Sequence, residues 1–502
     1  MGPPGPVSMF ASRRFVVSVA LALGASGGAA GSVRSVVAQY LPPTDRAARS
    51  VNATIPESVQ AAYDAARDLQ EALRVTAPRS AGCIALRAAV LDYASGVVDA
   101  QDGIDRPSAS IRAAGAARAN AASKRIATSQ SSCVDGAEGT VAVSTSIQPA
   151  SGEAFFGTVA GPVPAGTDTV EIQLDRTTVA RPRPQGGSLR VSVSAVPGRH
   201  DLRVVFRDKQ GTDLGHVESA NVWLLPAAAR VATPFHSRDA ALEQRLASEA
   251  KSFSGYAGLW VQNLRTGRAA GYNAGARFPA ASTVKLGLLA GSIAALGPNP
   301  QASRYFEDLR EMAGWSSNLA TNRLVQRLGS GCDSGAEALS TEGLRRLGAK
   351  VSTFTGCYIV GTELQPAMPA GSAVSSPPLE TARVTSAQDL SRMLYSLQAA
   401  AAGVGPARQE TRLTQQQARL ALGLLLASQQ VGDNRSNFLG GLPAGTLVAQ
   451  KNGWLRRARH GVALVFGPSG PSIVAMVTYR DSGVSPAEAA AFGARIARLA
   501  GG

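Results

Sequence analysis

The sequence predicts a multi-domain protein: a helical N-terminal module, an all-β sandwich-like module, and then a larger domain that mixes strands and helices. Its 502 residues leave room for about three domains. Hydrophobic residues make up 45% of the chain and charged residues 17%, so most of the chain can bury a core and is not a disordered polymer. The hydrophobic pattern changes its period near residues 138 and 235, which predicts modules at 45–135, 138–226 and 235–502.

Residues 1–38 are typical of an export signal. Arg13 and Arg14 precede an apolar, small-residue run that is too short to span a bilayer comfortably. Val36-Val37-Ala38 fits a small-residue cleavage site. We therefore expect an exported protein, whether periplasmic, cell-wall-associated or secreted, with no stable membrane span after the signal is removed. An uncleaved membrane anchor is the alternative.

The cysteine content agrees with export. Four cysteines fall as one pair in each half of the chain, and an even number in an exported protein suggests disulfides. The predicted bridges are Cys83–Cys133 and Cys332–Cys357, which is one of three connectivities. Free buried thiols are the alternative.

The first two modules are predicted from their periodicity. Residues 45–135 are alanine-rich with helical periodicity, which predicts two or three helices and no catalytic cluster. Residues 138–226 alternate polar and apolar side chains, for example over 169–174 and 202–206, and a Pro-Gly turn precedes the second of these runs. Such short strands indicate a sandwich, for which we expect a spacer function or contact with cell-wall polymer.

The last segment, 235–502, mixes the two periodicities. Helices are expected at 240–250, 282–295, 317–328, 415–429 and 486–499, and strands at 258–262, 446–450, 460–466 and 472–479. Because strands from both ends of the segment enclose the helices, we expect one sheet built from both ends, in an α/β or α+β fold.

Composition narrows the partners. The net charge is +15, which suits carboxylate-bearing substrates and anionic wall polymers. Aromatic residues are only 5% of the chain, which argues against a stacking-type nucleic-acid binder. None of the four histidines stands at metal-ligand spacing, so we expect no metal site and no cofactor. Lysine is rare, which draws attention to each one.

Ser282 and Lys285 form a Ser-x-x-Lys pair at the start of a largely apolar run. On a helix this spacing places both side chains on one face, with Ser282 at the N-terminus. A desolvated lysine near other cations loses proton affinity and can act as a base, which arginine cannot do. The pair therefore predicts an activated serine that needs no histidine. A second such pair, Ser248 and Lys251, lies on a polar helix and is expected at the solvated surface.

The Ser-x-x-Lys pair becomes a specific sequence signal because two further motifs follow it in a characteristic order. Ser316-Ser317-Asn318 opens a helix, and Lys451-Asn452-Gly453 follows a predicted strand. Ser-x-x-Lys, Ser-x-Asn and Lys-x-Gly in this order resemble the serine β-lactamase and penicillin-binding-protein superfamily. The flanks, Leu264 to Arg268 and Gly441 to Gly445, are similar to those of class A enzymes. The resemblance covers roughly 237–500 and implies a class A β-lactamase-like domain, a sheet flanked by helices.

The resemblance also implies a function for each motif residue. Ser282 would attack an amide carbonyl and form an acyl-enzyme, and Lys285 would take its proton directly or through water. Ser316 would relay a proton to the leaving nitrogen, while Lys451 would bias that relay and attract the substrate carboxylate. Asn318 would hold the substrate's side-chain amide. The backbone N–H groups of Ser282 and Trp454, next to Gly453, would form the oxyanion hole.

The chain departs from the class A pattern at several positions. Ser317 stands where class A enzymes usually have Asp, and Asn452 replaces a hydroxyl that would bind the substrate carboxylate. His460 lies at or beside the position of a carboxylate-binding Arg, so a cationic His460 or the adjacent Arg459 would take its place. A plain sheet residue is the other interpretation of His460.

The largest departure concerns the deacylating glutamate. The best register places Gly361 at its position, which leaves Glu363 as the candidate base; without a base the acyl-enzyme would hydrolyse slowly. Three functions remain open. The first is an exported class A-like hydrolase of β-lactams or related amides. The second is a D,D-peptidase or transpeptidase acting on peptidoglycan stems. The third is a wall-binding protein with a catalytically weak hydrolase domain.

Overall fold

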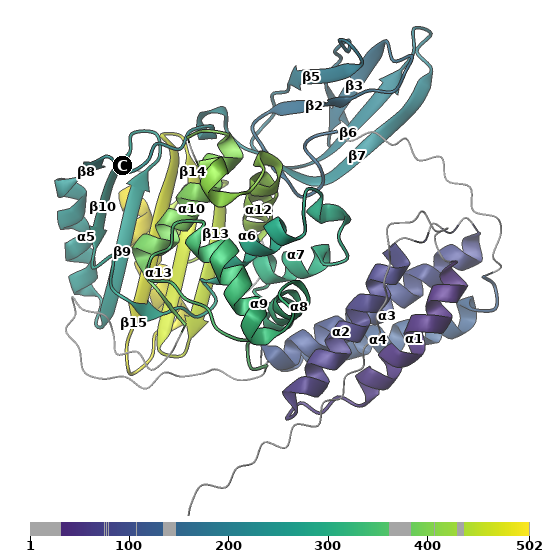
Figure 1. The fold of residues 1–502 in the computed structure, drawn as a ribbon, viewed down its shortest axis with the longest axis horizontal. Coiled ribbons are helices and arrows are strands. Elements are labelled where there is room, and N and C mark those ends of the chain that lie inside the picture. The colour runs from purple at the N-terminus through teal and green to yellow at the C-terminus, as the bar shows by residue number, and fades with distance from the viewer. Residues whose placement is uncertain are drawn as a thin grey trace, which may run out of the picture.

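The structure is a computed structural model that describes residues 32–133, 147–360, 383–428 and 436–500, apart from positions 75, 77, 79, 107 and 406. Within these ranges the chain forms a helical module, a β module and a mixed domain, in that order along the sequence. In Figure 1 both modules lie on the same side of the mixed domain, the β module (blue) toward the top and the helical module (purple) toward the bottom. Glu363 lies outside the described residues.

The helical module contains four helices, one or two more than predicted. They are α1 (Val33–Arg49), α2 (Pro56–Arg74), α3 (Ala81–Asp105) and α4 (Ala109–Ser129). Helices α3 and α4 approach closely through Gly96 and Gly115, since a Cβ on Gly96 would lie 2.7 Å from the Gly115 carbonyl oxygen. The predicted Cys83–Cys133 disulfide is present and joins the start of α3 to the segment after α4.

Helix α1 overlaps the predicted end of the signal segment. Val33 begins the helix, and Val33, Val36 and Val37 are buried in the core of the helical module. Cleavage after Ala38 would remove the first turn and a half of this helix together with those contacts. Among the described residues, the helical module thus begins with α1 at Val33, ahead of the predicted boundary at residue 45.

Helix α3 is, by length and composition, the described helix that could cross a membrane. Half of its most apolar window is buried inside the protein. It packs against α1, α2 and α4, and it ends in the buried carboxylates of Asp102 and Asp105. These contacts make α3 the central helix of the module.

The β module is a sandwich of two sheets. Its strands are β1 (Ala154–Phe155), β2 (Thr158–Pro162), β3 (Thr169–Leu174), β4 (Thr177–Ala180), β5 (Ser188–Ser192), β6 (Gly198–Arg207) and β7 (Asp213–Leu224). One sheet has the order β1-β7-β6-β3-β4, and β2 pairs with β5 in the second. Alternating side chains of these strands, such as Val170, Ile172 and Leu174, form a separate core, as the period-two pattern predicts.

The mixed domain is built on one six-stranded sheet, as expected from strands at both ends of the segment. Its order is β13-β14-β15-β9-β10-β8. The strands are β8 (Ser237–Arg238), β9 (Tyr256–Asn263), β10 (Arg268–Tyr272), β13 (Leu447–Leu455), β14 (Ala458–Gly467) and β15 (Gly470–Tyr479). Neighbours are antiparallel except β8 and β10. A short ladder of β11 (Phe278–Pro279) with β12 (Val384–Thr385) lies outside this sheet.

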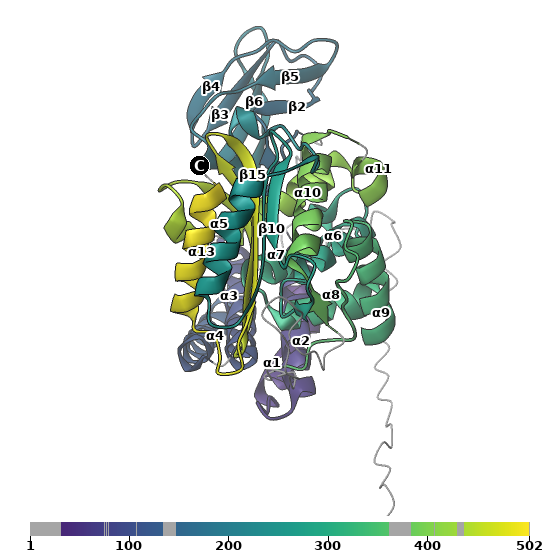
Figure 2. The same ribbon diagram turned by 90° about the vertical axis from the view of Figure 1, so that its left-hand side faces the viewer.

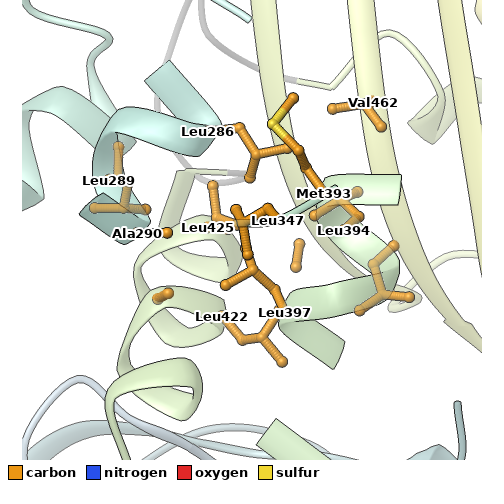
Figure 3. Packing of buried hydrophobic residues seen from close by; sticks show 14 of the residues in the cluster. Leu286, Leu289, Ala290, Leu347, Met393, Leu394, Leu397, Leu422, Leu425 and Val462 are labelled. Atoms are coloured by element: carbon orange, nitrogen blue, oxygen red, sulfur yellow. The ribbon is translucent and has the colours of Figure 1, made fainter. Parts of the chain in front are cut away.

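Helices cover both faces of the sheet (Figures 1 and 2). On one face lie α5 (Ala240–Ser252) and α13 (Pro486–Ala500). On the other lie α6 (Lys285–Ala295), α7 (Phe306–Gly314), α8 (Asn318–Leu328), α9 (Cys332–Leu339), α10 (Ala387–Ala402), α11 (Ala407–Thr411) and α12 (Gln415–Ala427). Figure 3 shows leucines of α6, α10 and α12 meeting Val462 of β14 in the main core.

The β module is joined to the mixed domain through a shared core. Ala154, Phe156 and Trp223 belong to the same buried cluster as residues of α12. Glu153 is buried at this junction, and its carboxylate accepts hydrogen bonds from Gln301 at 2.8 Å and Gln416 at 2.9 Å. These bonds replace the water that a buried carboxylate loses.

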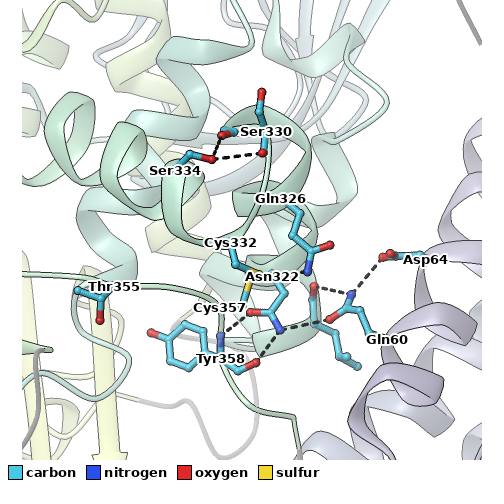
Figure 4. Close-up of a disulfide and its surroundings, with 12 residues drawn as sticks. Gln60, Asp64, Asn322, Gln326, Ser330, Cys332, Ser334, Thr355, Cys357 and Tyr358 are labelled. Carbon is cyan, nitrogen blue, oxygen red and sulfur yellow. Dashed lines mark hydrogen bonds between the residues drawn. A yellow bond between two sulfur atoms is a disulfide. The ribbon is translucent and has the colours of Figure 1, made fainter. Parts of the chain in front are cut away.

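The helical module packs against α7 and α8 of the mixed domain. Leu319 and Ala320 of α8 belong to the helical module's own core. Figure 4 shows Gln60 of α2 reaching across, where it donates to the Leu319 carbonyl oxygen at 3.2 Å and accepts from Asn322 at 3.3 Å. The turn that carries Ser316 and Ser317 lies at the end of this interface, where Ser317 donates to Asp102 of α3.

Arg323 of α8 is a fully buried charge at the interface. It donates to Asp308 at 3.0 Å and, across the interface, to Asp68 of α2 at 2.7 Å. Removing one partner of such a network leaves the other charges buried and unpaired, which is more costly than the loss of an exposed pair.

We expect Arg323→Ala to lower the free energy of unfolding by about 3–5 kcal/mol, measured by urea denaturation of the full chain. The control is Arg118→Ala, because Arg118 forms exposed ion pairs with Asp92 and Asp99, for which the expected loss is about 1 kcal/mol or less. Equal losses in the two variants would contradict the buried network.

Candidate active site

The predicted nucleophile lies in a turn and not in a helix. Helix α6 begins at Lys285, and Ser282 precedes it in a turn closed by the Lys285 N–H donating to the Ser282 carbonyl oxygen at 3.2 Å. Such i to i+3 turns place residues three apart almost above one another. The turn therefore brings residues 282 and 285 close together, as the Ser-x-x-Lys spacing predicts, although its backbone is wound more tightly than an α-helix. Ala281 enters it with a positive φ of 49°.

Lys285 is buried, with its amine held by two oxygen acceptors. Its Nζ donates at 2.6 Å to the Ser316 carbonyl oxygen and at 2.6 Å to Oδ1 of Asn318. Burial, and next the charge of Lys451, lower the pKa of Lys285 well below its usual value. A neutral amine has two N–H groups and one lone pair. With both N–H groups engaged, the lone pair is available to accept a proton.

Ser316 connects the two lysines. Its hydroxyl accepts a hydrogen bond from Nζ of Lys451 at 2.8 Å, while its carbonyl oxygen faces Lys285. The Ser316 backbone has a φ of +62°, a left-handed conformation that costs a serine about 1–2 kcal/mol. This conformation turns carbonyl and hydroxyl toward different lysines. Burial lowers the pKa of Lys451 to about 7.

Gly453 explains why strand β13 can approach the nucleophile. A Cβ at this position would lie 2.9 Å from the Ser282 nitrogen and 2.7 Å from the Thr283 nitrogen. Any larger side chain would therefore push the strand away from the backbone N–H of Ser282. The close approach places the strand that carries the predicted oxyanion donor, Trp454, beside the turn that carries the other.

Asn452 does not lie where the sequence places it. Lys451 and Gly453 lie on the face of β13 toward α6, so the alternation of a strand turns Asn452 to the opposite face. Its side chain is buried there, with Oδ1 about 3.1 Å from the Cβ position of Gly461 on β14. A buried amide on that face is not positioned to bind a substrate carboxylate, which corrects the prediction for Asn452.

His460 is a buried, neutral sheet residue. Its Nε2 donates to the Pro279 carbonyl oxygen at 2.6 Å and its Nδ1 accepts from the Thr478 N–H at 3.1 Å. Burial lowers the pKa of His460 to about 4. The predicted cationic, carboxylate-binding His460 is therefore wrong, and the alternative of a sheet residue describes it correctly.

Arg459 and Trp454 form a pair on neighbouring strands. The guanidinium lies 5.4 Å from the centre of the Trp454 ring, and Nε donates to the Val484 carbonyl oxygen at 3.1 Å. Val484 packs with α13, on the face opposite α6. The side chains of Arg459 and Trp454 are thus directed away from Lys285.

Tyr358 is a site residue that sequence reasoning missed. Its ring lies 4.3 Å from Nζ of Lys285, and its hydroxyl is within hydrogen-bonding reach of the Ser282 side chain. Burial raises the pKa of Tyr358, so the phenol stays neutral and can donate.

The position of Tyr358 depends on its neighbours in the chain and in α8. Its N–H donates to Asn322 at 2.7 Å, its carbonyl oxygen accepts from Asn322 at 2.8 Å, and the predicted disulfide Cys332–Cys357 is present beside it (Figure 4). The neighbouring disulfide was the sequence signal that could have pointed to this segment.

The helical module, for which the sequence predicts no catalytic cluster, accepts hydrogen bonds from residues of the site through two carboxylates. Asp105 accepts from the side chain of Asn318 at 3.2 Å, and Asp102 accepts from the Ser317 hydroxyl at 2.9 Å. The sequence feature that could have indicated this contact is a pair of acidic residues in the last turn of an apolar helix, where the helix dipole disfavours negative charge. Such acids imply a partner outside their own helix.

The site therefore brings together Ser282, Lys285, Ser316, Asn318 and Lys451, all five of the principal predicted residues. Two buried amines, a hydroxyl that accepts from one of them, and the backbone N–H groups of the Ser282 turn packed against strand β13 form an arrangement suited to nucleophilic acyl transfer.

The model of the beta-lactamase enzyme family matches residues 241–303 and 291–501. No curated protein matches the chain.

Among solved structures, the class A beta-lactamase of the last common ancestor of Gram-negative bacteria is 24% identical, with 52% of this chain and 98% of that chain covered and a TM-score of 0.39. A beta-lactamase from Desulfarculus baarsii is 24% identical, with 52% of this chain and 96% of that chain covered and a TM-score of 0.39. PBP-A is 19% identical, with 53% of this chain and 97% of that chain covered and a TM-score of 0.41.

The neutral state of His460 predicts a pH dependence of stability. Its pKa of about 4 in the folded protein lies below the value of about 6.5 expected on unfolding. The unfolded state therefore binds more protons as the pH falls from about 6.5 to 4, and stability is lost over that range. We expect the free energy of unfolding to fall by a few kcal/mol less between pH 8 and pH 4 in His460→Gln than in the unsubstituted protein, measured by urea denaturation. Exposed His216→Gln is the control, and a parallel pH profile for His460→Gln and the unsubstituted protein would contradict the assignment.

Proposed function

The chain belongs to the beta-lactamase enzyme family through its C-terminal half, and we propose that it is an exported serine hydrolase that forms an acyl-enzyme on Ser282 with a β-lactam or a related amide. The observation that carries the proposal is the pairing of both N–H groups of the Lys285 amine with the Ser316 carbonyl oxygen and Asn318, which leaves its lone pair for a proton. The two disulfides are consistent with export.

In acylation, the Ser282 hydroxyl oxygen attacks the amide carbonyl as its proton passes to Lys285, directly or through water. The oxyanion that forms is stabilised by the backbone N–H groups of Ser282 and Trp454. The Ser316 hydroxyl then gives its proton to the leaving nitrogen, and the proton is replaced through Lys451, whose amine is 2.8 Å away. The C–N bond breaks and an ester to Ser282 remains.

A second candidate is a D,D-peptidase or transpeptidase that acts on peptidoglycan stem peptides. It uses the same acylation residues and needs no fast hydrolysis of the ester. The observation that favours it is Gly361 at the register position of the deacylating glutamate, with Glu363 as the remaining acidic candidate in that segment. The β module would then provide contact with cell-wall polymer, and a wall-binding protein with weak catalysis is the limiting case.

The central experiment uses a fluorescent penicillin and a chromogenic cephalosporin. We expect covalent label on the full-length protein, and loss of more than about 10³-fold in labelling rate on Ser282→Ala, since the nucleophile is removed. The matched control is Ser248→Ala, in the other Ser-x-x-Lys pair of the chain. Fast turnover of the cephalosporin indicates the first candidate and a long-lived label the second. A protein that neither takes up label nor turns over the cephalosporin, or equal labelling of Ser282→Ala, would contradict both.

The pKa of Lys451 predicts an alkaline limit to acylation. In the free protein Lys451 loses its charge as the pH rises through about 7, and with it the attraction for a substrate carboxylate. We expect kcat/KM for a carboxylate-bearing β-lactam to fall above this pH, because kcat/KM reports the ionisation of the free enzyme. In Lys451→Arg the charge is permanent, so the fall should move to higher pH. An unchanged alkaline limb in the Arg variant would show that another group titrates.

A further inference from the structure

We propose that Asp105 and Asp102, at the end of α3, are positioning residues of the active site. The helical module is then required for efficient acyl transfer and is not an attached binding domain. This inference rests on the proposed acyl transfer at Ser282. It concerns how the Ser316-Ser317-Asn318 turn is held in position.

Asp105 contacts the turn through both of its carboxylate oxygens. Oδ1 accepts from Nδ2 of Asn318 at 3.2 Å, and Oδ2 accepts from the Asn318 backbone N–H at 3.2 Å. A carboxylate can only accept, so it selects the amide orientation in which Nδ2 faces α3 and Oδ1 faces the opposite way. Oδ1 is the atom that accepts from the Lys285 amine at 2.6 Å. Asp105 is therefore connected to the proposed base through one amide group.

Asp102 holds the preceding residue of the same turn. Its Oδ1 accepts from the Ser317 hydroxyl at 2.9 Å, and that hydroxyl in turn accepts from the Ala320 N–H at 3.2 Å as the cap of α8. The sequence has serine at 317 where the family pattern has an acidic residue. A carboxylate is nevertheless present at this turn, because α3 supplies it from another module.

The electrostatics of the two helices support this assignment. Two carboxylates in the last turn of α3 face the negative end of their own helix dipole, which is unfavourable. They are directed instead at the N-terminus of α8, where backbone N–H groups and the positive end of the dipole favour negative charge. The first turn of α8, from Asn318 to Thr321, contains only uncharged residues. Asp105 thus lies where a first-turn acid of α8 would, while burial raises the pKa of Asp102 to about 7.

Neighbouring contacts keep the end of α3 in place. Arg106 lies with its guanidinium 5.0 Å from the centre of the Trp315 ring, one residue before Ser316. Asp105 and Asp102 are both nearly inaccessible to solvent. The Arg323 network and the shared core around Leu319 hold the remainder of α8 against the helical module. Ser317, at the centre of the turn, is fully buried against α3, while Ser316 and Asn318 are half-buried.

Loss of Asp105 should affect catalysis through Asn318. Without the acceptor, the Asn318 amide is free to rotate, and the Lys285 amine loses its oriented partner. Misplacement of a reacting group by about 1 Å can cost about 10²-fold in rate. We therefore expect Asp105→Ala to lower the acylation rate constant by about 10- to 100-fold, with Asp105→Asn, which retains one acceptor oxygen, in between.

The experiment is a double-mutant cycle on the full-length protein, with acylation by fluorescent penicillin as the readout. The variants are Asp105→Ala, Asn318→Ala and the double variant, each checked by thermal melting. If Asp105 acts through Asn318, its removal in the Asn318→Ala background should change the rate by less than about threefold, because residues that act as a unit are not additive. If Asp105 contributed only to the stability of the structure, the rate losses of the two single variants would multiply in the double variant.

Asp99→Asn is the matched control, because Asp99 lies on α3 and forms an exposed pair with Arg118. It should acylate at the rate of the unsubstituted protein. If Asp105→Ala fails to fold, Asp105→Asn takes its place in the cycle. Acylation at full rate in the Asp105 variant, or fully multiplicative effects, would overturn the inference while leaving the proposed function intact. Absence of label on the unsubstituted protein would overturn both.

Discussion

The burial of the Lys285 amine is the constraint on which the rest of the site depends. A buried amine needs acceptors in place of water, and lowering its pKa requires that those acceptors carry no formal charge. A backbone carbonyl from Ser316 and an amide oxygen from Asn318 meet both conditions. The left-handed backbone of Ser316 and the bonds from α3 to Asn318 follow from this need, because each aims one of these oxygens at Lys285.

The interface between the helical module and the mixed domain combines apolar packing with paired charges. Leu319 and Ala320 extend the core of the helical module into α8, while Arg323 is surrounded by carboxylates from both sides. An apolar interface alone would allow sliding, whereas buried charge pairs require one register. That register brings the end of α3 to the turn before α8. The position of this turn and the attachment of the module are coupled for this reason.

The surroundings of Ser282 differ from what the motifs alone imply. Tyr358, as a neutral phenol held by Asn322 and close to the Cys332–Cys357 bridge, lies beside the hydroxyl that the motifs identify as nucleophile. Asn452 and His460 are turned into the sheet. Among the described residues to which the motifs assign a substrate carboxylate, Lys451 is the one whose charged group points toward Ser316.

Local sequence determined much of this protein. The period of the hydrophobic pattern predicted the order of the modules, the sheet built from both ends of 235–502, and most helices within a few residues, because amphipathic spacing reports burial directly. Motif order predicted that Ser282, Lys285, Ser316, Asn318 and Lys451 converge, and the cysteine spacing was consistent with both disulfides.

Tertiary structure alone decided the remaining features. The neutrality of His460 depends on how deeply its strand is buried, and the orientation of Asn452 depends on which face of β13 meets α6. The carboxylates of Asp102 and Asp105 are more than 200 residues from Ser317 and Asn318 in the chain. No local pattern encodes that contact, since it arises only when two helix ends of opposite polarity meet across an interface between modules.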